Sequence, residues 1–180
     1  MPFQRVPQPS PQRIVPAAGH PLVVGVVPGQ SEVVALTAAA WSDALGNIPL
    51  YFGYVDQSRT VYQEFPDGTV RHESLDPDLV DDSWLERDRL IREHLARILV
   101  DHSGPWEFRY LAGRPDRALT HLARAVDASA IIVGARHPSS TERVREFLNE
   151  SVALHLSRHQ HRPVITVPVA VVDWKASPAW

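Results

Sequence analysis

Two short, almost wholly apolar runs constrain the fold of this chain more than any other feature. They are Leu22–Val27 and Ala130–Gly134, and both are rich in β-branched residues. Strands buried on both faces have this composition, whereas strands with one wet face alternate between apolar and polar residues. Because such strands occur mainly in parallel sheets covered by helices, the two runs predict an α/β fold.

Strand and helix patterns alternate along the rest of the chain. Three further strands are predicted, at Leu50–Val55, Trp106–Tyr110 and Pro163–Val167. Apolar residues at helical spacing predict helices at Ser31–Leu45, Ser83–Ile98, Pro115–Val126 and Ser151–His159. The alternation therefore predicts a five-stranded, doubly wound parallel sheet of Rossmann-like type with helices on both faces.

Some details of these elements follow from single residues. Trp106, Phe108 and Tyr110 alternate with charged residues, which predicts that this strand lies at an edge of the sheet. Ser83 and Glu86 have the spacing of a capping box, so Ser83 is expected to cap its helix. The tryptophans on apolar faces or alternations are predicted to be core residues: Trp41, Trp84 and Trp106.

One additional element is predicted directly after the second strand. Between Thr60 and Glu73, two strand-like segments flank Pro66, Asp67 and Gly68. These residue types favour turns, since proline presets one backbone angle and glycine tolerates a positive φ. The pattern indicates a small β-hairpin inserted after strand 2.

Composition divides the chain into three parts and limits its partners. Residues 1–20 are a proline-rich tail expected to be disordered, 21–169 the expected folded domain and 170–180 a C-terminal tail. A net charge of -3 argues against nucleic acid, and no apolar run is long enough to span a membrane. The lack of cysteine and of a signal-peptide pattern favours a cytoplasmic protein.

Several short motifs follow one another between about Pro21 and Val169. They are Pro28–Ser31, Gly113–Pro115, Ala130–Gly134, Ser151–Leu156 and His161–Pro168. In this order the chain resembles the universal stress protein family. The resemblance implies a stress-response or regulatory protein on a doubly wound fold. It also implies a homodimer paired through the last strand, here Val164–Val169.

Many members of that family bind ATP through a loop of the form G-x2-G-x9-G-[ST] after the fourth strand. Glycines and the N-terminus of the next helix offer N–H groups to phosphate oxygens. The resemblance matches Gly134 to the first glycine, Ser140 to the second and Ser151 to the hydroxyl position. Glu150 replaces the third glycine, and its carboxylate competes with phosphate for the same donors and repels it.

Other positions implied by the resemblance surround this loop. Val55 matches the apolar position beside the adenine base, whereas the first strand lacks the aspartate that nucleotide-binding members carry at its end. Arg136 and His137 are positive candidates for compensating Glu150. The candidate cofactor-binding residues are Pro28, Gly29, Val55, Gly134, Arg136, His137, Ser140, Glu150, Ser151 and Val152. The expected ligand is ATP or another adenine nucleotide, such as cAMP.

The sequence also bears on functions other than nucleotide binding. A dimeric interaction module without nucleotide is favoured by Glu150 and by the missing aspartate. His155 and His159 have metal-ligand spacing but border the packed face of their helix, so no metal is expected. Catalysis is not expected, because the chain contains neither G-x-S-x-G nor G-x4-G-K-[ST].

Overall fold

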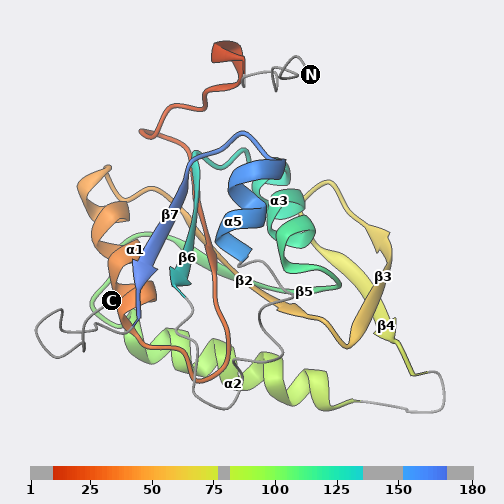
Figure 1. Ribbon diagram of the computed structural model, residues 1–180. Helices are drawn as coiled ribbons and strands as arrows, with labels where there is room; N and C mark the ends of the chain where they lie inside the picture. Colours follow the sequence, from red (N-terminus) through yellow and green to blue (C-terminus); the bar gives the residue numbers. More distant parts are fainter. Residues whose placement is uncertain (1–9, 77–81, 136–151, 170–180) are drawn as a thin grey trace, which may run out of the picture.

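The computed structural model describes residues 10–76, 82–135 and 152–169 (Figure 1). The elements in chain order are η1 (Pro11–Arg13), β1 (Leu22–Gly25), α1 (Val33–Ala44), β2 (Leu50–Asp56), β3 (Arg59–Glu64), β4 (Val70–Ser74), α2 (Ser83–Ile98), β5 (Trp106–Ala112), α3 (Pro115–Ala125), β6 (Ala130–Ala135), α5 (Val152–His159) and β7 (Val164–Pro168). No helix within these ranges has both the length and the apolar character that crossing a membrane requires.

The main sheet has five parallel strands in the order β5-β2-β1-β6-β7. The chain runs outward from β1 to β5 and then returns to the other side of β1, so the strand order reverses between β1 and β6. At such a reversal the loops diverge and leave a crevice at the carboxyl ends of the two strands. The predicted doubly wound sheet is confirmed, and β5 is an edge strand as predicted.

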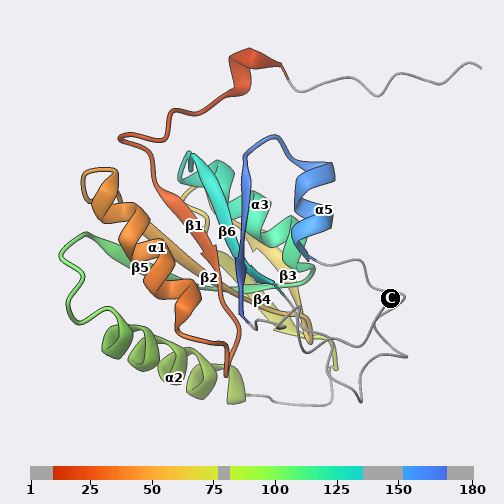
Figure 2. The same ribbon diagram turned by 60° about the vertical axis from the view of Figure 1, so that its left-hand side comes forward.

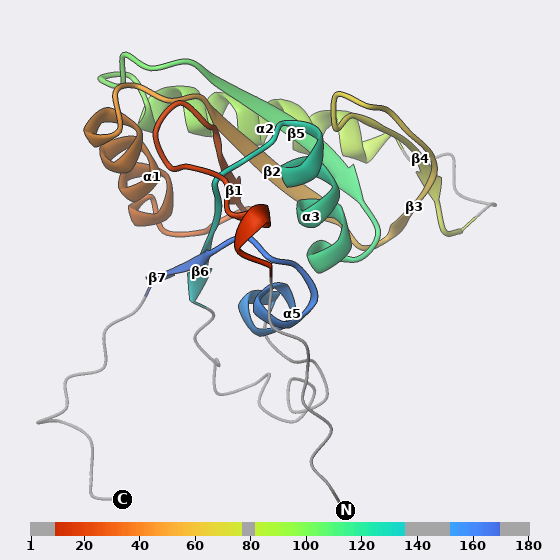
Figure 3. The same cartoon turned by 90° about the horizontal axis from the view of Figure 1, so that it is seen from above.

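Two hydrophobic clusters cover the two faces of this sheet. Leu22 and Val24 pack with α1 and α2, whereas Val23 between them packs with α3 and α5. Figures 2 and 3 show the two helix pairs on opposite sides. A strand covered on both faces buries every side chain, which explains why β1 contains no polar residue. Each such valine or leucine contributes roughly 1.5–3 kcal/mol to folding.

The predicted hairpin is also confirmed. β3 and β4 pair antiparallel, with Arg59 opposite Ser74, and form a sheet of their own beside β5. Gly68 in the connecting turn has a φ of +83°, and a Cβ there would lie 2.7 Å from Leu122 Cδ1 of α3. The glycine therefore allows both the turn and the close contact of the hairpin with α3.

Two predictions about helices are wrong. Trp41 is 45% exposed, because α1 packs on the sheet through small residues such as Ala38 and Ser42, and Trp41 lies outside that stripe. Ser83 is the first residue of α2, while Asp82 occupies the cap position and makes no side-chain capping hydrogen bond. Trp84 and Trp106, in contrast, are partly buried against the α1/α2 cluster.

The described part of the N-terminal segment contains a short 3-10 turn and a contact with the domain. Ser10 caps the short turn η1, its Oγ accepting a hydrogen bond from Gln12 N at 3.3 Å. His20 Nδ1 lies 3.3 Å from Asp127 Oδ2, just after α3. The segment therefore joins the domain through a contact with the end of α3.

Candidate functional site

A tight turn follows β1 and crosses the point where the strand order reverses. Gln30 N donates to Val27 O at 3.2 Å, and Gly29 between them has a φ of +72°. Proline at the second position of a type II turn presets φ, and glycine at the third accepts the positive φ. The dipeptide Pro28-Gly29 therefore specifies this turn and directs the chain back towards the strand end.

The side chain of Gln30 lies between the ends of β1 and β6. Val27 N donates to Gln30 Oε1 at 3.3 Å, and the amide nitrogen of Gln30 rests against Gly134. A Cβ at Gly134 would lie 2.3 Å from that nitrogen and 3.0 Å from Val169 Cγ1. The Gln30 amide thus occupies the space beside Gly134, and any atom that approaches the Gly134 backbone from this side must displace Gln30. Sequence reasoning missed Gln30, although the Pro-Gly turn is a signal for its position.

The structure brings some of the predicted nucleotide-binding residues together. Gly134 adjoins the Pro28–Gln30 turn on the side of the sheet that α1 covers. Val55 near the end of β2 and Val152 at the start of α5 are partly buried against the cluster on the other face. The remaining candidates lie outside the described residues: Arg136, His137, Ser140, Glu150 and Ser151.

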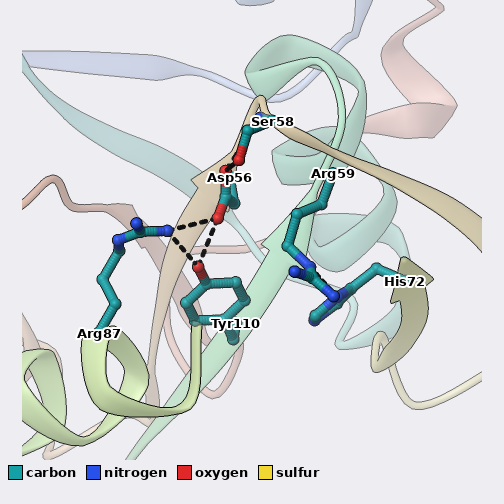
Figure 4. Close-up of polar contacts among 6 residues, drawn as sticks. All are labelled: Asp56, Ser58, Arg59, His72, Arg87 and Tyr110. Atoms are coloured by element: carbon teal, nitrogen blue, oxygen red, sulfur yellow. Dashed lines mark hydrogen bonds and ion pairs between the residues drawn. The ribbon is translucent and has the colours of Figure 1, made fainter. Parts of the chain in front are cut away.

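The carboxyl end of β2 contains a buried carboxylate just beyond the predicted strand Leu50–Val55. Asp56 is 3% exposed. Its Oδ1 accepts hydrogen bonds from Ser58 N at 2.9 Å and Ser58 Oγ at 2.6 Å. Its Oδ2 accepts from Arg87 of α2 and from the Tyr110 hydroxyl, both at 2.6 Å (Figure 4). The signal in the sequence was that Asp56 continues the alternation of Leu50, Phe52 and Tyr54 along β2.

Electrostatic effects in this network act in opposite directions. Burial disfavours the ionised form of Asp56, but the hydrogen bonds from Ser58 and Tyr110 and the charge of Arg87 together hold its pKa below the ordinary value. Burial and the hydrogen bond to Asp56 raise the pKa of Tyr110. Asp56 is therefore a fixed anion whose acceptor sites are occupied, which makes it a poor general base.

Aromatic rings extend the network to the hairpin. The His72 ring of β4 lies 4.8 Å from that of Trp84 and 5.4 Å from that of Tyr110, measured between centroids. Arg59 Nε donates to His72 Nδ1 at 2.7 Å. We call these residues the Asp56 cluster: Asp56, Ser58, Arg59, His72, Trp84, Arg87 and Tyr110. Because they come from the hairpin, α2, β5 and the end of β2, the cluster joins the hairpin to the domain.

The two histidines of α5 stack on each other. The rings of His155 and His159 have centroids 5.8 Å apart and planes inclined by 24°. Within the described ranges, no group of three or more histidine, cysteine, aspartate or glutamate side chains is arranged to hold a metal ion.

The strand order, with its reversal between β1 and β6, defines a doubly wound α/β protein. A model of the universal stress protein family matches residues 20–168. The chain therefore belongs to the universal stress protein family, and the resemblance recognised in the sequence is confirmed. A sequence comparison with curated proteins finds no match.

Solved structures of universal stress proteins have the same fold. One from Lactobacillus plantarum is 18% identical, with a TM-score of 0.59 over 84% of this chain and 99% of that chain. One from Archaeoglobus fulgidus in complex with dAMP is 20% identical, with a TM-score of 0.56 over 82% of this chain and 97% of that chain. A third, in complex with cAMP, is 21% identical, with a TM-score of 0.56 over 85% of this chain and 99% of that chain.

Proposed function

We propose that this chain is a regulatory stress-response protein that binds an adenine nucleotide in the crevice between β1 and β6, through a modified phosphate loop. Membership of the family and the complexes of structural relatives with dAMP and cAMP support the ligand class. The observation that carries the proposal is Gly134 at the end of β6, beside the turn after β1. Without a Cβ, its backbone is open to a phosphate once Gln30 moves. A chain without cysteine suits action in the cytoplasm.

Nucleotide binding at Gly134 requires the Gln30 side chain to move, which costs free energy. Its amide must leave Gly134 and give up the long hydrogen bond from Val27 N. A net hydrogen bond contributes about 1 kcal/mol, which corresponds to roughly a fivefold change in affinity. We therefore expect Gln30→Ala to bind AMP and ATP about fivefold more tightly than the parent, measured by isothermal titration calorimetry.

The matched control is Gln63→Ala, which removes an exposed glutamine from β3. This variant should bind nucleotide as the parent does. If neither the parent nor Gln30→Ala gives heat with AMP, ATP or cAMP at millimolar concentration, the nucleotide proposal is wrong.

The alternative is a dimeric interaction module on the same fold that binds no nucleotide. Two features favour this alternative: the Gln30 side chain occupies the space beside Gly134, and Glu150 places a carboxylate in the loop. It predicts that the parent does not bind and that Glu150→Gly gains affinity for ATP. A parent that already binds tightly, with no gain in Glu150→Gly, would reject this alternative.

We also propose that the chain acts by binding rather than by catalysis, and that it forms a homodimer through Val164–Val169. The saturated Asp56 carboxylate supports the first point. The position of β7 at the edge of the sheet supports the second. An exposed edge strand offers unpaired backbone groups to a second copy.

A further inference from the structure

A groove of about 670 Å³ lies on the other face of the sheet, away from Gln30. Its wall contains Arg117, His121 and Arg124 of α3, Arg114 just before α3, and His155 and His159 of α5. Two carboxylates also line it, Glu64 from the hairpin and Asp116 from α3. Arg114 Nη2 lies 2.9 Å from Asp116 Oδ2, so these two charges neutralise each other.

Two arginines of the groove differ from Arg89 and Arg92 on α2. Arg89 contacts Glu86 and Glu93, and Arg92 contacts Asp88. Arg117 and Arg124, in contrast, form no ion pair or side-chain hydrogen bond among the described residues, and both are exposed. α3 therefore presents positive charge without a paired carboxylate on the face that lines the groove, whereas Arg89 and Arg92 are each balanced by carboxylates of their own helix.

The positive charge of Arg124 lowers the pKa values of neighbouring basic groups. Burial lowers the pKa of Arg162, and the charge of Arg124 lowers it further. Burial also lowers the pKa of His161, with Arg162 and Arg124 among the contributing charges. A bound anion would relieve this repulsion, because it would place negative charge among the cationic side chains.

The spacing of the arginines indicates the kind of anion. Arg117 and Arg124 are seven residues apart, so they lie on one face of α3, two turns and about 10 Å apart along its axis. Arginine binds phosphate through two parallel hydrogen bonds, and two separate arginines match a ligand with more than one phosphoryl group. We propose that this groove binds a small linear polyphosphate anion along α3, facing the two histidines of α5.

The test uses the whole 180-residue chain and inorganic tripolyphosphate, with orthophosphate as the single-phosphate probe. In isothermal titration at low salt, tripolyphosphate should bind the parent, and the double variant Arg117→Gln/Arg124→Gln should bind it at least about tenfold more weakly. The control Arg97→Gln removes an exposed arginine near the end of α2 and should change the affinity less than about twofold. Circular dichroism verifies that each variant is folded.

A second variant should change the affinity for tripolyphosphate in the opposite direction. Glu64→Gln removes a carboxylate that lies 3.4 Å from His121 Nδ1, keeps the size of the side chain, and should strengthen tripolyphosphate binding a few-fold. The proposal is wrong if the double variant binds like Arg97→Gln, or if orthophosphate binds as tightly as tripolyphosphate. It is also wrong if a single-stranded oligonucleotide binds more tightly than tripolyphosphate at the same site. Binding of AMP should be unchanged in the double variant, which separates this groove from the crevice at Gln30.

Discussion

Asp56 is an example of a single residue whose role depends on several distant partners. Its carboxylate is almost fully buried and would be costly without compensation. Ser58 follows it closely in the chain, but Arg87 and Tyr110 come from α2 and β5. The negative charge therefore holds a helix and an edge strand at the end of β2, where the hairpin begins.

Replacing Asp56 should destabilise the protein strongly. Asp56→Ala leaves the Tyr110 hydroxyl and the Arg87 guanidinium without their acceptor, and we expect a loss of roughly 2–4 kcal/mol in the free energy of unfolding. Asp56→Asn keeps an acceptor but loses the charge and should fall between Ala and the parent. Urea unfolding measures these changes. Glu86→Ala, which breaks an exposed ion pair on α2, should have a much smaller effect, and equal losses in Glu86→Ala and Asp56→Ala would contradict the assignment.

His72 should make stability depend on pH. Burial, followed by the charge of Arg59, lowers its pKa below the ordinary 6.5. As the pH falls below about 6.5, the unfolded chain binds a proton that the folded chain resists, so the free energy of unfolding decreases. His161, whose pKa is also lowered, contributes with the same sign.

The measurement is urea unfolding of the parent and of His72→Gln between pH 8 and pH 5. The difference between the two curves should shrink as the pH falls, because the variant has lost one source of acid destabilisation. The difference in free energy of unfolding that is already present at pH 8 reports the lost contact with Arg59. Parallel curves would show that His72 carries no such linkage.

The hairpin forms a sheet separate from the main one, and it contacts three parts of the structure. Its turn packs against α3, and His72 of β4 reaches Trp84 of α2 and Tyr110 of β5. A hairpin alone is marginally stable in water, so its order must come from these contacts. β3 and β4 are therefore expected to open more readily than β1 when the contacts are weakened.

Gly68 tests this view of the hairpin. Gly68→Ala combines the strain of a φ of +83° with a Cβ placed 2.7 Å from Leu122 Cδ1. Gly113→Ala is the matched control, since its φ of +86° is similar but no atom lies within 4 Å of its Cβ. We expect about 1–2 kcal/mol of destabilisation for Gly113→Ala and a larger loss for Gly68→Ala. Hydrogen exchange should show faster opening of β3 and β4 in Gly68→Ala alone; equal effects in both variants would mean that the contact with α3 is unimportant.

At the scale of the whole molecule, the two edge strands of the main sheet, β5 and β7, have different neighbours. The hairpin lies against β5, whereas no described element lies beyond β7. Ile131 N donates to Pro163 O, so the alternation of a parallel pair directs the N–H of Ile165 towards β6 and that of Thr166 outward. Pro168 lies at an outward position as well, where its missing N–H breaks no bond to β6. The free edge of β7 is thus the place where a second copy would pair.

Thr166→Pro should weaken this pairing without unfolding the subunit. The substitution removes an outward N–H that a partner strand would use, while the bonds between β6 and β7 remain. Light scattering at micromolar concentration should give the mass of a dimer for the parent and of a monomer for the variant. Thr166→Val keeps the N–H and should remain dimeric. A monomeric parent would reject the proposed interface.

Local patterns determined the strands, the helices and the order in which they alternate. The apolar runs Leu22–Val27 and Ala130–Gly134 predicted the parallel sheet correctly, because burial on both faces excludes polar side chains from such strands. Pro66-Asp67-Gly68 predicted the hairpin, because a tight turn depends on its own residues. The family resemblance followed from the same local motifs.

Tertiary structure alone decided which distant side chains meet. That Gln30 covers Gly134, and that Arg87 and Tyr110 share Asp56, depends on the strand order and on the rotation of α1 and α2 against the sheet. Trp41 shows the same limit, since an apolar residue near a buried stripe can still face solvent. Short-range patterns reflect the backbone and burial of one segment, whereas a binding site depends on side chains from several segments, and only packing brings these together.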